Sequence, residues 1–156
     1  MIPPEEFRAE TYFAEIAGRV YVEYQKLLRQ NNALDFDDLL TETAYLFRYN
    51  PEVLARYQQF YDHVLVDEFQ DTNTAQYTLL RQLTATKHNL YVVGDPDQSV
   101  YRWRGADYRN VRRFQDDHPD AITILLEQNY RSTQLILDAA MAVIDKNIGR
   151  TRKELF

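Results

Sequence analysis

Two adjacent carboxylates, Asp67 and Glu68, directly follow the short apolar run 64–66. This run has no polar position to face solvent, so it predicts a central strand of a parallel sheet. In open α/β sheets ligands bind beyond the carboxyl ends of the strands, where both acids would lie. An Asp at that edge can hold Mg²⁺, and a Glu can also orient or deprotonate a water. The pattern indicates metal-assisted phosphoryl transfer, with Asp67 and Glu68 at the metal and Glu68 as the base.

The same acids also have an ordinary structural interpretation. A strand followed by an acidic turn is common, and Gln70 and Asp71 can cap a following helix as readily as they can couple two sites. Asp95 and Asp97 follow a glycine, where aspartates often serve only as turn residues. The acids by themselves leave both interpretations open.

Three longer stretches favour the chemical interpretation. They are DEFQDTN at 67–73, GDPDQSVYRWRGAD at 94–107 and LEQNYRS at 126–132. In this order and at this spacing they resemble motifs II, III and IV of the UvrD/PcrA/Rep family of superfamily 1 DNA helicases. LDFDDLL at 34–40 resembles a further block of that family.

The resemblance implies an ATP-dependent 3′ to 5′ DNA helicase that couples ATP hydrolysis to translocation on single-stranded DNA, with ATP and Mg²⁺ as cofactors. Asp67 and Glu68 then hold the metal, and Glu68, Gln98 and Arg131 are catalytic. Gln98 senses the γ-phosphate, for which a neutral amide that both donates and accepts is suited. Arg131 acts as an arginine finger, and Tyr130 stacks on adenine. Without motifs II and III, Arg131 would be interpreted as an ordinary surface residue at the start of a helix.

A DNA contact is expected at Tyr101, Trp103 and Arg104. Aromatic side chains stack on bases at roughly 1–3 kcal/mol each without demanding a sequence. The net charge is −6 and the pI about 5.0, so any DNA contact must be local. A cluster of arginines supplies the local charge: Arg102, Arg104, Arg109, Arg112 and Arg113. Because Gln98 and Trp103 share one loop, loss of the γ-phosphate would move the DNA contact.

The family's phosphate-binding loop, G-x-x-x-x-G-K-[ST], does not occur among the 156 residues. We therefore expect the isolated chain not to hydrolyse ATP and to need the missing remainder of the helicase chain as a partner. One alternative is a truncated, non-catalytic remnant or interaction module that binds single-stranded DNA weakly. Another is a metal-dependent nuclease or phosphatase built on Asp67, Glu68 and Asp95.

Composition limits the remaining possibilities. A hydrophobic fraction of 45% with 13% aromatic residues predicts a packed globule. There is no cysteine, which excludes disulfides, and the three histidines are too scattered for a zinc site. No apolar run is long enough to span a membrane, and the first residues lack the order of a signal peptide. We expect a cytoplasmic protein with no membrane partner.

The expected fold is α/β: a three-layer RecA-like P-loop NTPase domain with a largely parallel sheet, incomplete because the P-loop strand is missing. Apolar spacing predicts a first helix that faces the core at 9–31. Further helices are expected at 35–47, 51–60, 74–83, 107–117 and 133–146, and strands at 64–66, 90–93 and 121–126. The missing strand should leave a gap, or 90–93 should pair directly with 121–126.

The resemblance also divides the chain. Residues 1–34 would be the helical tail of an inserted subdomain, and 35–127 the C-terminal half of the first RecA-like motor domain. Residues 128–156 would begin the second RecA-like motor domain.

Overall fold

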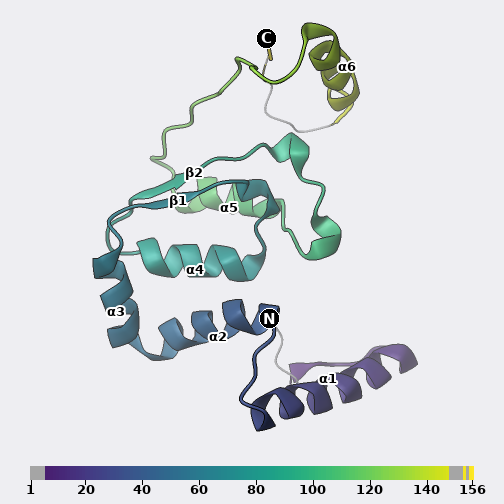
Figure 1. Cartoon of the computed structure of the whole chain (residues 1–156), viewed down its shortest axis with the longest axis vertical. Coiled ribbons are helices and arrows are strands. Elements are labelled where there is room, and N and C mark those ends of the chain that lie inside the picture. Colours follow the sequence, from purple (N-terminus) through teal and green to yellow (C-terminus); the bar gives the residue numbers. More distant parts are fainter. Residues whose placement is uncertain (1–5, 148–152, 154) are drawn as a thin grey trace. The chain divides into compact units, whose positions relative to one another are not determined.

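The computed structural model describes residues 6–147, 153, 155 and 156, with the side chain of Arg104 left out. The predicted helices and two of the predicted strands are present (Figure 1). Their order is α1 (Tyr12–Gln30), α2 (Phe36–Tyr49), α3 (Pro51–Phe60), β1 (Val64–Val66), η2 (Phe69–Asp71), α4 (Thr74–Thr84), β2 (Leu90–Val92), η3 (Pro96–Gln98), η4 (Arg102–Arg104), α5 (Arg109–Asp117) and α6 (Gln134–Ile144). Here η denotes a short 3₁₀ turn.

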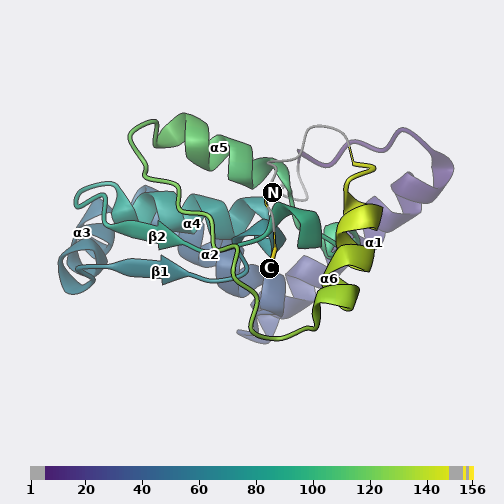
Figure 2. The same ribbon diagram turned by 90° about the horizontal axis from the view of Figure 1, so that it is seen from above.

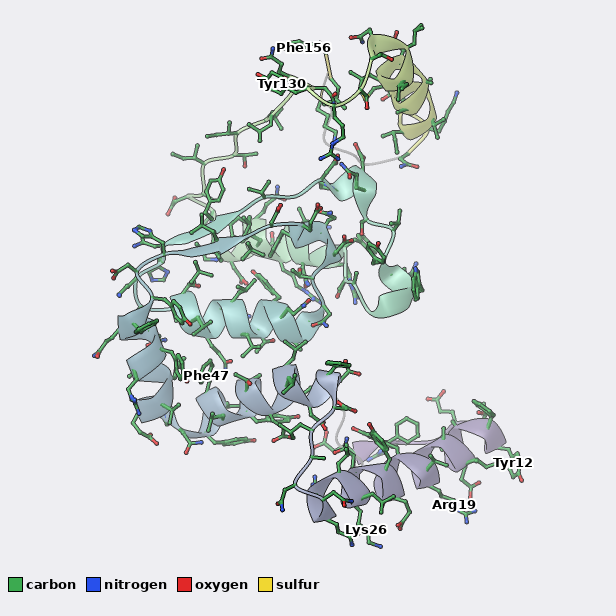
Figure 3. All side chains as sticks on the ribbon, in the orientation of Figure 1. Tyr12, Arg19, Lys26, Phe47, Tyr130 and Phe156 are labelled. Carbon is green, nitrogen blue, oxygen red and sulfur yellow. The ribbon has the colours of Figure 1, made fainter. Side chains whose placement is uncertain are left out.

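The chain packs as two compact units, each assembled from two separate stretches. The first comprises residues 1–64 and 74–91, and the second comprises 65–73 and 92–156. In the first unit α2, α3 and α4 pack on one another. Phe47 of α2, labelled in Figure 3, is buried with its ring 5.4 Å from that of Tyr57 on α3. In the second unit the rings of Phe69 and Phe114 meet edge to face at 5.6 Å.

The start of α2 follows the sequence prediction. The amide of Asp38 donates to Asp35 Oδ1 at 2.8 Å, and the amide of Asp35 donates to Asp38 Oδ2 at 3.1 Å. This capping box satisfies two amides that have no partner within the helix. The hydrogen bond from the Asp38 amide holds the pKa of Asp35 below its usual value.

Helix α1 does not face a core, and that part of the prediction is wrong. The helix contains no buried residue, and Phe13 is 80% exposed. Tyr12, Arg19 and Lys26 mark its length in Figure 3. Near its end the Tyr24 hydroxyl donates to Asp35 Oδ2 at 2.9 Å. Apolar periodicity identifies the helix and its apolar face, but it does not say what covers that face.

Strands β1 and β2 form a two-stranded parallel sheet (Figure 2). The amide of Val64 donates to the Asn89 carbonyl at 3.0 Å, and the amide of Val93 donates to the Val66 carbonyl at 2.8 Å. The parallel direction of the strands agrees with the sequence prediction. The prediction of a central strand without a solvated face was wrong, since Leu65 is 72% exposed.

The strand predicted at 121–126 does not form. Residues 121–129 adopt no regular structure, and Ile122 is 88% exposed. Direct pairing of 90–93 with 121–126, one of the two expected outcomes, is therefore wrong. The other, a gap left between these two strands, is not tested because 121–126 forms no strand. An extended run becomes a strand only when a neighbour pairs with its backbone. The described chain is thus an α/β protein, mostly helical, with a small parallel sheet. None of its described helices combines the length and apolarity needed to span a bilayer.

Candidate functional site

The turn after β1 presents Asp67 and Glu68 at the carboxyl end of the strand, and both residues are exposed. Asp67 Oδ1 accepts a hydrogen bond from the Glu68 amide at 2.8 Å. Glu68 has a left-handed backbone, with φ of 49° and ψ of 41°. A residue other than glycine rarely adopts this conformation, and such strained positions concentrate at functional sites.

Gln70 joins this turn to the loop that follows β2. Its side chain is 1% exposed. Gln70 Nε2 donates to Glu68 Oε2 at 2.7 Å, while Gln70 Oε1 accepts from the Asp95 amide at 2.9 Å. Gln98 Nε2 then donates to Asp95 Oδ2 at 2.8 Å. The result is a continuous set of hydrogen bonds through Glu68, Gln70, Asp95 and Gln98, which we call the carboxylate–amide relay.

Gly94 provides the space for this relay. A Cβ atom at Gly94 would lie 2.6 Å from Gln70 Oε1 and 3.1 Å from the Phe69 amide nitrogen. Neither neighbour is the end of a loose surface side chain, because Gln70 is buried and the Phe69 atom is backbone. Close approach of two backbone segments therefore requires glycine here.

The loop from 95 to 107 carries the aromatic residues expected to contact DNA. Trp103 is 75% exposed, and Tyr101 is also exposed. Their ring centroids are 6.3 Å apart with the planes tilted by 47°. The side chain of Arg104, the third residue of this expectation, lies outside the described part of the structure.

Asp107 ties the end of this loop to two of the clustered arginines. Arg109 binds both carboxylate oxygens of Asp107, at 2.7 and 2.9 Å, and Arg113 Nη1 donates to Oδ2 at 3.0 Å. The hydrogen bond from Arg109 is the main reason that the pKa of Asp107 lies below its usual value. Arg109 and Arg113 therefore bind a carboxylate of the protein itself. Arg102 and Arg112 are exposed, as is Arg109.

Lys153 is a neighbour of the loop that the sequence did not reveal. Its Nζ is hydrogen bonded to Asp95 Oδ1 and lies 3.3 Å from Asp97 Oδ2. Burial raises the pKa of Asp95, but the hydrogen bonds from Lys153, Gln98 and the Asp97 amide outweigh burial and bring that pKa below its usual value. Lys153 is 58 positions from Asp95 in sequence, and no local pattern relates them.

Tyr130 and Arg131 are not brought to the relay. The Tyr130 hydroxyl donates to Gln128 Oε1 at 2.8 Å, and the Arg131 amide donates to Asn129 Oδ1 at 2.9 Å. Beside Tyr130, labelled in Figure 3, the Asn129 amide also donates to the Phe156 carbonyl at 2.6 Å. Across the residues that the structure describes, no hydrogen bond or ion pair joins Tyr130 or Arg131 to Glu68 or Gln98.

The acidic turn fits an ion shared with a phosphate. Mg²⁺ commonly uses one or two carboxylates and completes its shell with water and phosphate oxygens. Asp67 and Glu68 each use one oxygen in the hydrogen bonds above, so the other oxygen of each carboxylate can face an ion. Among the residues that the structure describes, no group of three or more His, Asp or Glu side chains is arranged to hold a metal alone.

Comparison with known proteins gives one family. The family described as the UvrD/REP helicase N-terminal domain matches residues 2–119. The ATP-dependent DNA helicase PcrA of Leuconostoc citreum is 50% identical over 158 residues, covering 100% of this chain and 21% of that protein. PcrA of Bacillus subtilis (strain 168) is 53% identical over 155 residues, covering 98% and 21% respectively. PcrA of Staphylococcus aureus (strain Mu50) is 52% identical over 148 residues, covering 95% and 20%. The chain thus spans about a fifth of these relatives' length.

Proposed function

The chain belongs to the UvrD/REP helicase family, and from this premise we propose that it forms part of an ATP-dependent DNA helicase similar to PcrA. In this proposal ATP hydrolysis drives 3′ to 5′ movement along single-stranded DNA. The observation that carries it is the carboxylate–amide relay. The relay connects Glu68, an acid placed for phosphoryl chemistry, with Gln98 in the loop that bears Trp103.

The domain assignment follows from the same premise. Residues 67–73, 94–107 and 126–132 act as helicase motifs II, III and IV. Residues 1–34 belong to an inserted subdomain, 35–127 to the first RecA-like motor domain, and 128–156 to the second. Strands β1 and β2 are then two strands of a larger three-layer domain. The exposed apolar side chains at 121–126 support this, because they suit a strand whose partner lies elsewhere in the helicase.

Asp67 and the residues of the relay divide the chemistry among them. Mg²⁺ bound by Asp67 and Glu68 would neutralise phosphate charge. Glu68 orients the attacking water and takes its proton, and Gln70 fixes the direction of the Glu68 carboxylate. Gln98 Nε2 donates one of its two hydrogens to Asp95 Oδ2, so the second can donate to a phosphate oxygen. A nucleotide phosphate bound to Gln98 would therefore be linked through Asp95 to the start of the loop that bears Trp103.

Arg131 and Tyr130 complete the nucleotide site in this proposal. Arg131 supplies positive charge to the transferring phosphoryl group, and Tyr130 stacks on adenine. Both are exposed in the structure. Their side chains are therefore accessible to a nucleotide held by other parts of the helicase.

The coupling test uses a chimera in which these 156 residues replace the matching fifth of Bacillus subtilis PcrA. We expect Trp103→Ala to impair unwinding more than ATP hydrolysis measured without DNA. Trp103 is expected to contact DNA and is not part of the relay, so its loss should largely spare hydrolysis. Glu68 is the proposed base, so Glu68→Gln should abolish both activities. Equal loss of both activities in Trp103→Ala would contradict the proposal.

The isolated chain is expected not to turn over ATP, because the 156 residues contain no phosphate-binding loop. A phosphate-release assay with and without oligo(dT) checks this. Turnover that disappears in Glu68→Gln would show that the chain supplies a complete site.

A second candidate is a non-catalytic module that binds single-stranded DNA. The separation of Tyr130 and Arg131 from the relay favours it. Trp103 is the only tryptophan, so quenching of its fluorescence by oligo(dT) measures binding in the chain itself. In the chimera, an oligo(dT) affinity that ATP and Mg²⁺ leave unchanged would favour the module over the motor.

A further inference from the structure

Asn110 is a polar side chain with no exposed surface, on helix α5. It lies four residues before Phe114, so both project from the same face of the helix. Phe114 packs on Phe69 in the turn after β1. A buried carboxamide loses its contact with water, and its burial is unfavourable unless its hydrogen bonds are made within the protein.

Both the nitrogen and the oxygen of the Asn110 carboxamide make hydrogen bonds. Asn110 Nδ2 donates to the Thr72 carbonyl at 2.9 Å and lies 3.2 Å from Thr72 Oγ1. Its Oδ1 accepts from Arg113 Nη1 at 2.9 Å. The Thr72 hydroxyl donates in turn to the Phe69 carbonyl at 2.7 Å. Asn110 therefore attaches α5 to Thr72, the residue that ends the turn after β1. We call this turn, residues 67–72, the acidic turn.

Thr72 also holds the end of the aromatic loop. The Asp107 amide donates to the Thr72 carbonyl at 3.0 Å, and the Asn110 amide donates to the Asp107 carbonyl at 2.8 Å. At the other end of the loop, Asp95 is held by Gln70. The loop that bears Trp103 is thus fixed at both ends to two positions of one short turn, Gln70 and Thr72.

We propose that Asn110 is a positioning residue for the contact with single-stranded DNA. By holding the far end of the loop on Thr72, it makes the position of Trp103 follow that of the acidic turn. The relay alone fixes only the near end, and a loop anchored at one end would not carry a displacement to its tip. The proposal rests on the proposed function only for the identity of the ligand.

Asn110→Asp is the sharpest variant. It keeps an oxygen for Arg113 but replaces the donor that faces the Thr72 carbonyl with a second acceptor. Thr72→Val is a milder variant that removes only the hydroxyl, and Thr72→Ser is the conservative variant that keeps every bond. The matched control is Gln82→Ala. It removes a carboxamide that donates to a backbone carbonyl, that of Ala44 at 3.1 Å, in the unit without the loop.

The experiment uses the 156-residue chain, with folding checked by circular dichroism. Trp103 fluorescence anisotropy and acrylamide quenching report the loop without DNA, and titration with oligo(dT) of about 12 nucleotides reports binding. We expect Asn110→Asp to lower the anisotropy, raise acrylamide quenching and weaken binding about five- to tenfold, as partial loss of one stacked base would. Thr72→Val should change the same quantities less. Thr72→Ser and Gln82→Ala should match the unsubstituted chain.

A folded Asn110→Asp with unchanged Trp103 signals would overturn the inference, and so would equal changes in Gln82→Ala. If Asn110→Asp does not fold, Thr72→Val tests the inference instead. Unchanged Trp103 anisotropy and acrylamide quenching in Thr72→Val would then overturn it. Failure of the unsubstituted chain to bind oligo(dT) would count against the proposed function instead. The measurements of Trp103 without DNA would still decide whether Asn110 positions the loop.

Discussion

The buried side chain of Gln70 donates a 2.7 Å hydrogen bond to the exposed carboxylate of Glu68. The same carboxamide accepts from the Asp95 amide, 25 positions further along the chain. One glutamine therefore sets both the direction of an acid and the start of a distant loop. The stability and binding of the second unit should depend strongly on this residue.

Gln70→Leu should lower the free energy of unfolding by about 1–3 kcal/mol, since it leaves the partly buried Asp95 amide without its partner. Urea unfolding measures the change. Gln134→Leu is the matched control, because Gln134 also donates to a carboxylate, that of Asp138 at 2.8 Å, but is exposed. It should change stability by less than about 0.5 kcal/mol. Equal effects of the two substitutions would contradict the role given to Gln70.

Gly94→Ala should destabilise the chain by about 1–3 kcal/mol, because the added methyl group has no room beside Gln70 and Phe69. Gly18→Ala is the comparison. Its Cβ would lie 2.8 Å from Phe7 Cδ1, on a side chain that can swing aside. Alanine also favours the interior of α1 by up to about 1 kcal/mol. Urea unfolding of both variants checks the order, and the prediction fails if Gly94→Ala is the more stable.

Acid should weaken the end of the aromatic loop through Asp107. Its pKa is lower in the folded chain than in the unfolded chain, so the unfolded chain takes up the proton first. The contribution of Asp107 to stability is therefore complete above about pH 4 and is lost as the pH falls toward its folded-state pKa. Asp107→Asn should be less stable than the unsubstituted chain at neutral pH, with the difference shrinking in acid. Urea unfolding across this range measures the difference, and a constant difference would contradict the prediction.

The exposed Arg102 and the paired Arg109 should differ in their effect on DNA binding. Arg102→Ala should weaken binding to oligo(dT) and reduce the slope of log affinity against log salt by about 0.7, the loss of one phosphate contact on a single strand. Arg109→Ala should leave that slope nearly unchanged, because Arg109 is bound to Asp107. Titrations of Trp103 fluorescence at several salt concentrations measure both slopes. A larger fall in Arg109→Ala would show that the loop reorganises on DNA.

Local signals in the sequence predicted local structure well. The cap of α2 depends on Asp35 and Asp38, three positions apart, and strand β2 is a compact apolar run, so nearby residues suffice to specify each. The run at 121–126 is equally apolar but remains unpaired. Hydrogen bonds to a neighbouring strand decide that outcome, and composition does not contain this information.

The candidate site was only partly predictable. Sequence placed Glu68 and Gln98 after successive strands, and parallel pairing brings those ends to one edge. The hydrogen bond between Gln70 and Asp95 joins residues 25 positions apart, and no periodic pattern in the sequence predicts it. Asn110 did leave a signal, as a polar residue on the face of α5 that carries Phe114, but it was not recognised.

Glu68, the proposed base, has an unfavourable main-chain conformation. Its φ of 49° lies in the left-handed region that glycine adopts readily and that costs other residues about 1–3 kcal/mol. An engineer seeking a more heat-resistant chain would be drawn to install glycine at this position. That exchange would relax the turn and remove the acid on which the proposed chemistry depends. At Glu68, therefore, the substitution that favours stability is the one that would remove the proposed activity.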